Sequence, residues 1–418
     1  SLPVRPLEDF EDGDTYSCKF WGLGGDGTVG ANHNTIRILG DCADMYAQAY
    51  FEYDSKKSFG VTKSHLRLSK KPIRSPYYVK RADFVACHNQ SYVRQYDMVQ
   101  EVKPGGTFLL NTTWTPEELD ANLPGKMKRY IAQNGIRLFT VDAVEVAQRV
   151  GLGSHINTVL QAAFFQIAGL MPVEEALDYM KDAARKSYAR KGDAVVAKNV
   201  AAIEEGAQKC VEVAVPASWA DAPLDESAAE ADVPAVVENI LRPVNAQKGD
   251  DLPVSAFAGY EDGVIDMGLT AYEKRGIAVK TPAWNAEACI QCNRCAFVCP
   301  HAAIRPYLLD QDEAQNAPEG FTTVALKGGK DLPEGTRYAI QVSQFDCTSC
   351  GSCADVCPAG ALDMQPAKLT DQVRKLWDFG LTISDKDGAF DPYTVKGSQF
   401  KQPLLEFSAA CAGCGETP

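Results

Sequence analysis

Eight of the 14 cysteines of this 418-residue chain fall into two runs of identical spacing, C-x-x-C-x-x-C-x-x-x-C followed by proline. In bacterial iron–sulfur proteins, three thiolates of such a run bind one [4Fe–4S] cluster and the fourth cysteine ligates the other cluster. The expected ligand sets therefore cross between the runs: Cys289, Cys292, Cys295 and Cys357 for one cluster, and Cys347, Cys350, Cys353 and Cys299 for the other. Two clusters tied in this way lie close enough to exchange electrons.

Two other uses of cysteine fit the pattern less well. Zinc prefers four ligands at C-x-x-C … C-x-x-C spacing, and eight ligands in this order would be unusual for it. Disulfides need an oxidising compartment, and we recognise no secretion signal in the sequence. The cysteine pattern favours a reducing setting, which we take to be the cytoplasm of an anaerobic bacterium or a comparable compartment.

A second candidate site is a glycine-rich turn near the start of the chain. The segment Gly22–Gly30 (GLGGDGTVG) follows a predicted strand and precedes a helical stretch, which is the context that G-x-G-x-x-G requires. Glycines let backbone N–H groups approach phosphate oxygens, and the helix N-terminus adds its positive end. A plain tight turn is the alternative, but the context favours a phosphate site.

The charges downstream of this turn bear on the kind of phosphate ligand. A dinucleotide site has an acidic residue about 20 residues on, which binds the ribose, and Asp54 could serve. The nearby lysine pair, Lys56 and Lys57, suggests an additional phosphate. Coenzyme A, with a diphosphate and a ribose 3′-phosphate, suits this pattern, and NADP is the competing ligand. For Lys70 and Lys71 a solvated surface is the simpler interpretation.

The elements that must position these motifs alternate between strands and helices over the first half of the chain. We expect strands at 16–21, 83–86, 107–110 and 137–141, and helices at 44–53, 91–99, 116–121, 143–150, 157–168, 173–189 and 193–206. Such alternation predicts an α/β fold, a parallel-sheet Rossmann-like domain with extra helices, over residues 1–213. Cys18, Cys42, Cys87 and Cys210 have no ligand spacing and are expected to be buried apolar residues.

The second half of the chain has a different character. Residues 214–268 are rich in proline and read as a wrapping linker with one short helix at 235–241. Residues 269–375 are expected to form an α+β ferredoxin-like domain for the two [4Fe–4S] clusters, with residues 310–338 as an inserted loop or hairpin. Residues 376–418 form a connector with little periodicity that leads to a third cysteine pair, Cys411 and Cys414.

Composition limits the remaining function classes. The net charge of −13 argues against nucleic-acid binding, which needs a basic surface. No apolar run approaches the ~20 residues that a membrane span requires. The abrupt ends lead us to expect a piece of a longer polypeptide.

Taken together, these motifs resemble pyruvate:ferredoxin oxidoreductase. The resemblance is carried by both cysteine runs and by Gly22–Asn32 (GLGGDGTVGAN), Asp54–Ser58 (DSKKS), Ala86–Asn89 (ACHN), Gly397–Phe400 (GSQF) and Cys411–Pro418 (CAGCGETP). It covers essentially the whole chain and implies the central portion of a larger enzyme.

The resemblance also implies site residues. Residues 1–213 would be the coenzyme A domain, of the 2-oxoacid oxidoreductase gamma type. Its contacts would come from Gly24, Gly25, Asp26, Gly27, Thr28, Lys56, Asn157 and Asn199. Cys411 and Cys414 would be half of the ligands of a third [4Fe–4S] cluster. Glu416 would face thiamine diphosphate, so residues 376–418 would end in the truncated start of a thiamine diphosphate domain.

The implied reaction is the oxidative decarboxylation of pyruvate to acetyl-coenzyme A and CO2, with electrons passed to ferredoxin or flavodoxin. Thiamine diphosphate and Mg²⁺ would be bound only in the full-length enzyme, which is expected to be a homodimer. Two other functions compete: an oxidoreductase for another 2-oxoacid, and a non-catalytic electron-transfer module joined to a nucleotide-binding domain. Neither nucleic acid nor membrane is expected as a partner.

Overall fold

The computed structural model describes residues 14–54, 59–153, 155–225, 233–266, 268–329 and 332–401. The chain divides into two compact units. The first comprises Ser1–Ser55 and Phe59–Ala229, and the second comprises Lys56–Ser58 and Glu230–Pro418. Each unit contains its own hydrophobic core.

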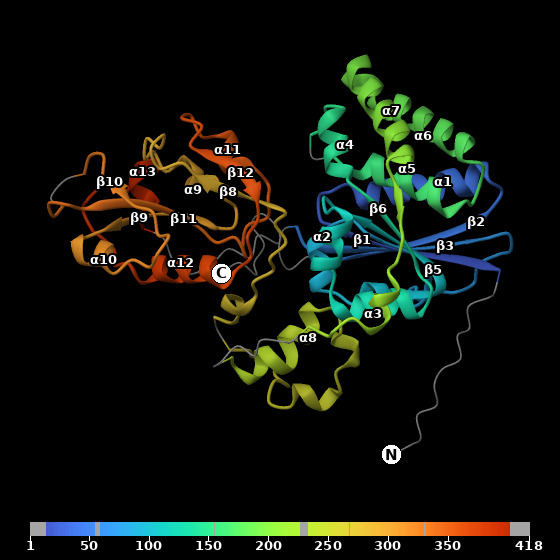
Figure 1. Ribbon diagram of the computed structural model, residues 1–418, viewed down its shortest axis with the longest axis horizontal. Coiled ribbons are helices and arrows are strands. Elements are labelled where there is room, and N and C mark those ends of the chain that lie inside the picture. Colours follow the sequence, from blue (N-terminus) through green and yellow to red (C-terminus); the bar gives the residue numbers. More distant parts are fainter. Residues whose placement is uncertain are drawn as a thin grey trace. The chain divides into compact units, whose positions relative to one another are not determined.

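The first unit is built on a seven-stranded sheet of order β2-β3-β1-β4-β5-β6-β7 (Figure 1). β1, β4, β5 and β6 run parallel, whereas β3 is antiparallel to β1 and β2, and β7 is antiparallel to β6. The sheet is therefore mixed but mostly parallel, which confirms the Rossmann-like expectation. The strands are β1 (Thr15–Leu23), β2 (Tyr46–Tyr53), β3 (Val61–Ser69), β4 (Ala82–Cys87), β5 (Val102–Asn111), β6 (Arg137–Val141) and β7 (Val211–Val213).

Helices cover both faces of this sheet, with α1 and α4–α7 on one face and α3 on the other (Figure 1). The main core lies under α1 and α5, where Phe164 packs edge-to-face on Phe20 and Phe84 at centroid distances of 5.2 and 5.1 Å. Within the described residues, no helix of either unit is long and apolar enough to cross a membrane. The helices of this unit are α1 (Thr28–Cys42), α2 (Pro116–Asn122), α3 (Gly125–Gln133), α4 (Ala143–Arg149), α5 (Asn157–Ala168), α6 (Val173–Tyr188) and α7 (Asp193–Gln208).

Two predicted helices of this unit are wrong. Residues 44–53 form the edge strand β2, which pairs with β3 over its whole length, and β3 itself was not predicted. The aromatic residues of the segment suit a strand, and pairing with β3 decides the outcome. Residues 91–99 instead contain two 3₁₀ helices, at Gln90–Arg94 and Met98–Glu101, the first started by Asn89, whose side chain accepts from Ser91 N at 3.0 Å.

The cysteines outside the runs follow the expectation only in part. Cys18 and Cys87 are buried in the sheet, as predicted. Cys210 is half-buried, and Cys42 is exposed at the last residue of α1. The prediction for Cys42 is therefore wrong: Ile38 and Leu39 are the residues that the end of α1 buries, and Cys42 faces solvent.

The second unit contains two small antiparallel sheets, β12-β8 and β10-β11-β9. Two one-turn helices, α9 (Arg294–Phe297) and α11 (Ser352–Asp355), each begin within one cysteine run. This arrangement matches the α+β, ferredoxin-like expectation. The strands are β8 (Lys280–Trp284), β9 (Ile304–Leu309), β10 (Val324–Ala325), β11 (Arg337–Val342) and β12 (Leu362–Pro366).

The proline-rich segment before this module has regular structure of its own. The short helix predicted at 235–241 is present, but it winds as a π-helix over Val237–Leu241 and continues as α8 (Arg242–Asn245). Val236, Val237, Ile240 and Leu269 bury one another in a small separate cluster. The described part of this segment is thus a folded subdomain rather than an extended tether.

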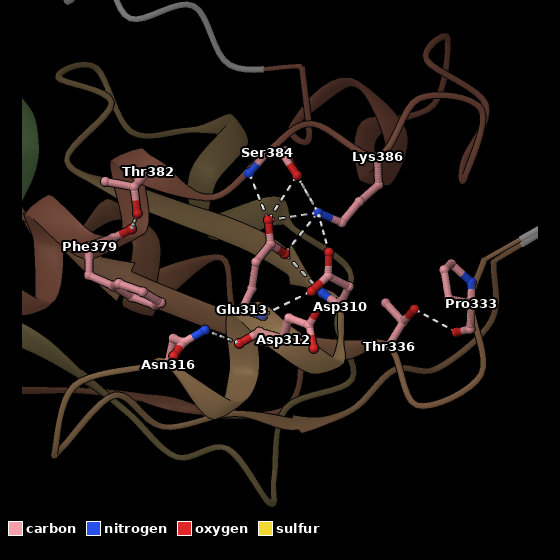
Figure 2. A network of polar contacts seen from close by, with 10 residues as sticks. All are labelled: Asp310, Asp312, Glu313, Asn316, Pro333, Thr336, Phe379, Thr382, Ser384 and Lys386. Carbon is pink, nitrogen blue, oxygen red and sulfur yellow. Dashed lines mark hydrogen bonds and ion pairs between the residues drawn. The ribbon is translucent and has the colours of Figure 1, made fainter.

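The insertion between the two cysteine runs connects the antiparallel strands β9 and β11 and carries α10 (Gln311–Gln315) and β10, so it has the expected hairpin character. An ion-pair network fastens it to the chain downstream (Figure 2). The Glu313 carboxylate accepts from Lys386 Nζ at 2.8 and 2.9 Å and from Ser384 N at 3.0 Å. Burial opposes ionisation, but these bonds and one from Asp310 N lower the pKa of Glu313 to about 2. The segment after α12 (Asp371–Thr382) is therefore held on the insertion before it reaches α13 (Val395–Ser398).

Candidate functional site

The second unit repeats one loop conformation at its two cysteine runs. In each run, the residue before the second cysteine and the residue after it have left-handed backbones: φ is 59° at both Gln291 and Asn293, 63° at Ser349 and 79° at Gly351. Three of these four residues are not glycine, and each bears a conformation that L-residues rarely adopt. Identical spacing in sequence therefore produces the same winding of the cysteine loop twice.

The crossed cysteine sets line two separate cavities. Three cysteines of the first run and the last cysteine of the second run line what we call the first cavity: Cys289, Cys292, Cys295 and Cys357. The complementary set lines the second cavity: Cys347, Cys350, Cys353 and Cys299. The structure thus brings together the two sets that the sequence rule predicts. Their role as cluster ligands stays a prediction.

Backbone amides point at the sulfur atoms of both cavities in a matching pattern. Gln291 N lies 3.3 Å from Cys289 Sγ, and Ser349 N lies 3.5 Å from Cys347 Sγ. The fourth cysteines receive the same contact, from Ala303 N to Cys299 Sγ at 3.3 Å and from Ala361 N to Cys357 Sγ at 3.2 Å. Amide donors on sulfur stabilise thiolates and tune cluster potentials. The residues present fit [4Fe–4S] clusters in both cavities.

The thiols of these cavities are poor acids without a cation beside them. Burial, together with a smaller contribution from neighbouring cysteines, raises the pKa of Cys295 and Cys347 to about 12 and of Cys353 to about 11. Iron must therefore displace protons when it binds. Across the described ranges, no group of three His, Cys, Asp or Glu side chains is placed to hold a single metal ion.

In the first unit, the glycine turn has the predicted strand–turn–helix geometry. β1 ends at Leu23 and α1 begins at Thr28, with Gly25 and Gly27 at φ values of 88° and 86°. The Asp26 carboxylate points back into the turn and accepts from Leu23 N at 2.9 Å and Thr28 N at 2.7 Å. Asp26 therefore organises the turn and occupies two of its amide donors.

The two predicted asparagines have different surroundings. A Cβ atom at residue 27 would lie 2.8 Å from Cγ of Asn157, so this asparagine, at the start of α5, packs directly on the glycine turn. Asn199 is buried on α7, and its amide donates to Val195 O at 2.9 Å within the same helix. The structure therefore brings Asn157 to the turn, and a ligand role for Asn199 stays a prediction.

Sequence reasoning assigned no role to His88, which the structure places at the turn. Its Nδ1 lies 2.6 Å from Thr28 Oγ1, and its backbone N donates to Trp21 O at 2.8 Å. Burial, only partly opposed by Asp26, lowers the pKa of His88 to about 4, so its ring is neutral at pH 7. His88 follows β4 directly, beside β1 in the sheet, and the carboxyl ends of adjacent parallel strands are where such folds bind ligands. Its place just after a predicted strand could therefore have pointed to His88 from the sequence.

Four predicted site residues lie outside the described residues: Lys56, Cys411, Cys414 and Glu416. Sequence reasoning also missed the residues around the first cavity, Gln291, Asn293 and Lys396. Gln291 bonds to Ala325 O at 2.8 Å and Lys327 N at 2.7 Å, and Asn293 bonds to Lys396 O at 2.8 Å. These contacts join segments far apart in the chain, so no local pattern pointed to them.

Comparison with family models divides the chain in the same order. Residues 17–209 match a model described as pyruvate ferredoxin/flavodoxin oxidoreductase, and residues 224–278 match a domain of unknown function. Residues 288–361 match a 4Fe-4S dicluster domain. This last match shows that the second unit carries an iron–sulfur domain.

Similar curated proteins cover the whole chain. A pyruvate:ferredoxin oxidoreductase of Moorella thermoacetica is 52% identical, and a pyruvate-flavodoxin oxidoreductase of Enterobacter agglomerans is 50% identical, each over 100% of this chain. A pyruvate dehydrogenase [NADP(+)] of Cryptosporidium parvum is 44% identical, also over 100% of this chain. The chain spans 36% of the length of the first two and 23% of the third.

Proposed function

Since the chain belongs over its whole length to the pyruvate:ferredoxin and pyruvate-flavodoxin oxidoreductases, we propose that it is the coenzyme A-binding and electron-transfer part of such an enzyme. In the reaction of the whole enzyme, pyruvate and coenzyme A yield acetyl-coenzyme A, CO2, two electrons and one proton. The electrons leave singly for ferredoxin or flavodoxin. Pyruvate binding and thiamine diphosphate with Mg²⁺ are assigned to other parts of the enzyme, which is proposed to be a homodimer in a reducing, anaerobic cytoplasm.

The crossed lining of the two cavities carries the electron-transfer half of this proposal. Each cavity takes three cysteines from one run and one from the other, which is the ligand pattern of a two-cluster module. Each cavity would hold one [4Fe–4S] cluster, which supplies one-electron chemistry. The chain's own residues bind the iron, aim amide donors at sulfur and exclude water. Cys411 and Cys414 would seat half of a third cluster, beside Glu416 at the thiamine site.

The position of Asp54 supports coenzyme A over a dinucleotide. In a dinucleotide fold, the ribose-binding acid ends the strand beside the first strand of the sheet. Here Asp54 follows β2, and the antiparallel strand β3 lies between β2 and β1. We assign the phosphate contacts to the Gly24–Thr28 turn and Lys56, with Asn157 and Asn199 as further ligand contacts. The boundaries proposed for the domains are 1–213, 214–268, 269–375 and 376–418.

Iron and sulfide analysis tests the electron-transfer half. Chain reconstituted without air should bind about eight irons with equal inorganic sulfide and show the broad absorption of cubane clusters. Cys299→Ala should lose the second cavity's cluster, and Cys357→Ala the first cavity's, each leaving about half of the iron. Cys42→Ala, which removes an exposed cysteine outside both runs, should keep the full load. Stoichiometric zinc without sulfide would overturn the proposal.

One relative gives a reason to test a second electron acceptor. The Cryptosporidium protein is named for NADP(+) and is similar to this chain over the chain's whole length. The chain corresponds to 23% of that protein, a smaller share than in the two bacterial relatives. Reduction of ferredoxin or flavodoxin, but not NADP(+), by the pyruvate-reduced parent enzyme would support the acceptor proposed here. Direct reduction of NADP(+) without either carrier would replace it.

A further inference from the structure

The two cavities have matching loop conformations and amide contacts to sulfur, so a difference in the charges around them should distinguish the clusters that they would hold. The cysteine loops align residue by residue, with Asn293 opposite Gly351 and Arg294 opposite Ser352. Arg294 lines the first cavity, and Ser352 lines the second, where its Oγ lies 3.6 Å from Cys350 Sγ. At this position the first copy has a cation and the second has a neutral hydroxyl.

Two lysines from outside the repeat bring further positive charge beside the first cysteine loop, although neither lines the cavity itself. Lys327, in the insertion, donates from Nζ to the backbone oxygen of Cys289 at 2.9 Å. Lys396, on α13, donates from Nζ to Lys327 O at 2.8 Å. The Lys396 ammonium also lies 4.4 Å from the Phe390 ring centroid and near enough to Cys289 and Cys292 to interact with their charges.

The position of Lys396 is fixed by contacts made inside the module. Its backbone oxygen accepts from Asn293 Nδ2 at 2.8 Å, and Asn293 Oδ1 accepts from the buried hydroxyl of Tyr338 at 2.7 Å. Lys396 is half-buried, so solvent screens its charge less than it screens that of the exposed Lys327. These hydrogen bonds therefore hold Lys396 beside the first cysteine loop.

The second cavity has no counterpart of Arg294 among the described residues that line it. Its lining beyond the cysteines is mostly apolar, with Thr348, Ser352 and His301 as the polar members. The nearest acid in sequence, Asp346, is neutralised by Lys274 at 2.7 Å and by a hydrogen bond from Ser343 at 2.6 Å. A cluster in this cavity would meet no net charge from that pair.

We propose that Lys396, assisted by Lys327 and Arg294, raises the reduction potential of the cluster in the first cavity above that of the cluster in the second. An iron–sulfur cluster gains negative charge when it takes an electron, and a fixed cation nearby favours the reduced form. The first electron to enter the pair therefore resides in the first cavity. This inference rests on the proposed function, because it presupposes that both cavities hold clusters.

The test compares midpoint potentials in the reconstituted full chain, by redox titration followed with electron paramagnetic resonance. Lys396→Met should lower only the higher of the two potentials, by a tenfold change in the reduction equilibrium, or about 59 mV for one electron. Lys396→Arg should restore it. Lys375→Met removes the same charge from an exposed position on α12 that lines neither cavity, and it should leave both potentials unchanged.

The remaining outcomes separate the two proposals. Iron and sulfide are counted in every variant before titration, so failure to load either cavity in the unmodified chain counts against the proposed function. Full loading with equal shifts in Lys396→Met and Lys375→Met overturns the inference alone, as does a shift of the lower potential. In Cys299→Ala, which leaves only the first cavity with a complete set of four cysteines, the surviving potential should be the higher one, and the lower one would contradict the assignment.

Discussion

The hydroxyl of Tyr338 donates a 2.7 Å hydrogen bond to the amide oxygen of Asn293, and both side chains are almost fully buried. Asn293 follows Cys292 directly and holds a left-handed backbone at φ 59°. Its other amide atom donates to Lys396 O. One asparagine thus joins the first cysteine loop, the central strand β11 and α13.

Tyr338→Phe should destabilise the second unit by about 1–3 kcal/mol, because it leaves the buried Asn293 oxygen without a donor. Anaerobic denaturant unfolding of the loaded chain, followed by loss of cluster absorption, measures the change. Tyr393→Phe removes the same hydroxyl from a residue that is 96% exposed and should have no effect beyond error. Equal stability of the two variants would contradict a supporting role for this bond.

Gly27→Ala should disturb the glycine turn in two ways. Residue 27 has φ 86°, and a Cβ atom there would lie 2.8 Å from Asn157 Cγ, so the change strains the backbone by about 1–2 kcal/mol and pushes Asn157 away. We expect lower stability and weaker coenzyme A binding by calorimetry. Gly30→Ala places a methyl group in open space inside α1 and should keep binding while stabilising the unit slightly. Unchanged affinity in Gly27→Ala would argue against a ligand at this turn.

Lys56→Glu should abolish coenzyme A binding, which we expect to be micromolar or weaker in this chain. The change replaces attraction to the ligand's phosphates by repulsion, and each phosphate charge contributes about 1 kcal/mol to the lost attraction and about 1 kcal/mol to the new repulsion at contact distance even in water. For a doubly charged phosphate the sum is about 4 kcal/mol, or roughly a thousandfold in affinity. Dephospho-coenzyme A tests which phosphate is bound. Equal affinity for the two ligands would count against a role for the lysine pair at the 3′-phosphate.

The free energy of unfolding of the first unit should become smaller as the pH falls below about 6.5, because the folded chain lowers the pKa of His88. Its pKa is lowered to about 4 in the fold, so between these values the unfolded chain binds a proton that the folded chain does not. The contribution of His88 to the free energy of unfolding is therefore fully present above the pKa of the unfolded chain. It is lost as the pH falls, by at most about 1.4 kcal/mol per pH unit. Burial also lowers the pKa of His65, which acts in the same direction.

Denaturant unfolding between pH 5 and 7 measures this slope. His88→Asn should lower stability at pH 7 and flatten the pH dependence, because the titrating ring is gone. His33→Gln alters an exposed histidine and should keep the slope of the unmodified chain. Because His65 still contributes, a smaller slope should remain in His88→Asn, and a slope as steep as that of the unmodified chain would assign the pH dependence to groups other than His88.

The parts of the fold that were predictable are those fixed by local chemistry. The cysteine spacing alone led to the crossed sets that line the two cavities, because loop winding and ligand spacing are properties of a few adjacent residues. The strands β1, β4, β5 and β6 were visible as short apolar runs. The edge strand β2 was not, because Tyr46–Tyr53 becomes a strand only through its pairing with β3.

The surroundings of the candidate sites were less predictable than their central residues. His88 and Asn157 reach the glycine turn from separate elements of the fold. Lys396 contacts Lys327, in the insertion, across a sequence separation of 69 residues. Such contacts depend on tertiary packing, and no spacing rule in one sequence encodes them.

Because each run supplies one cysteine to the other run's cavity, the order of synthesis decides when each set of four cysteines is complete. During synthesis, the second cavity's set of cysteines is incomplete until Cys353 has left the ribosome, and the first cavity's set is incomplete until Cys357 has followed. A nascent chain halted anywhere between the runs would offer only three thiols at one site. Both cages are thus completed only late in synthesis, and a frameshift in the insertion would leave neither of them with its four cysteines.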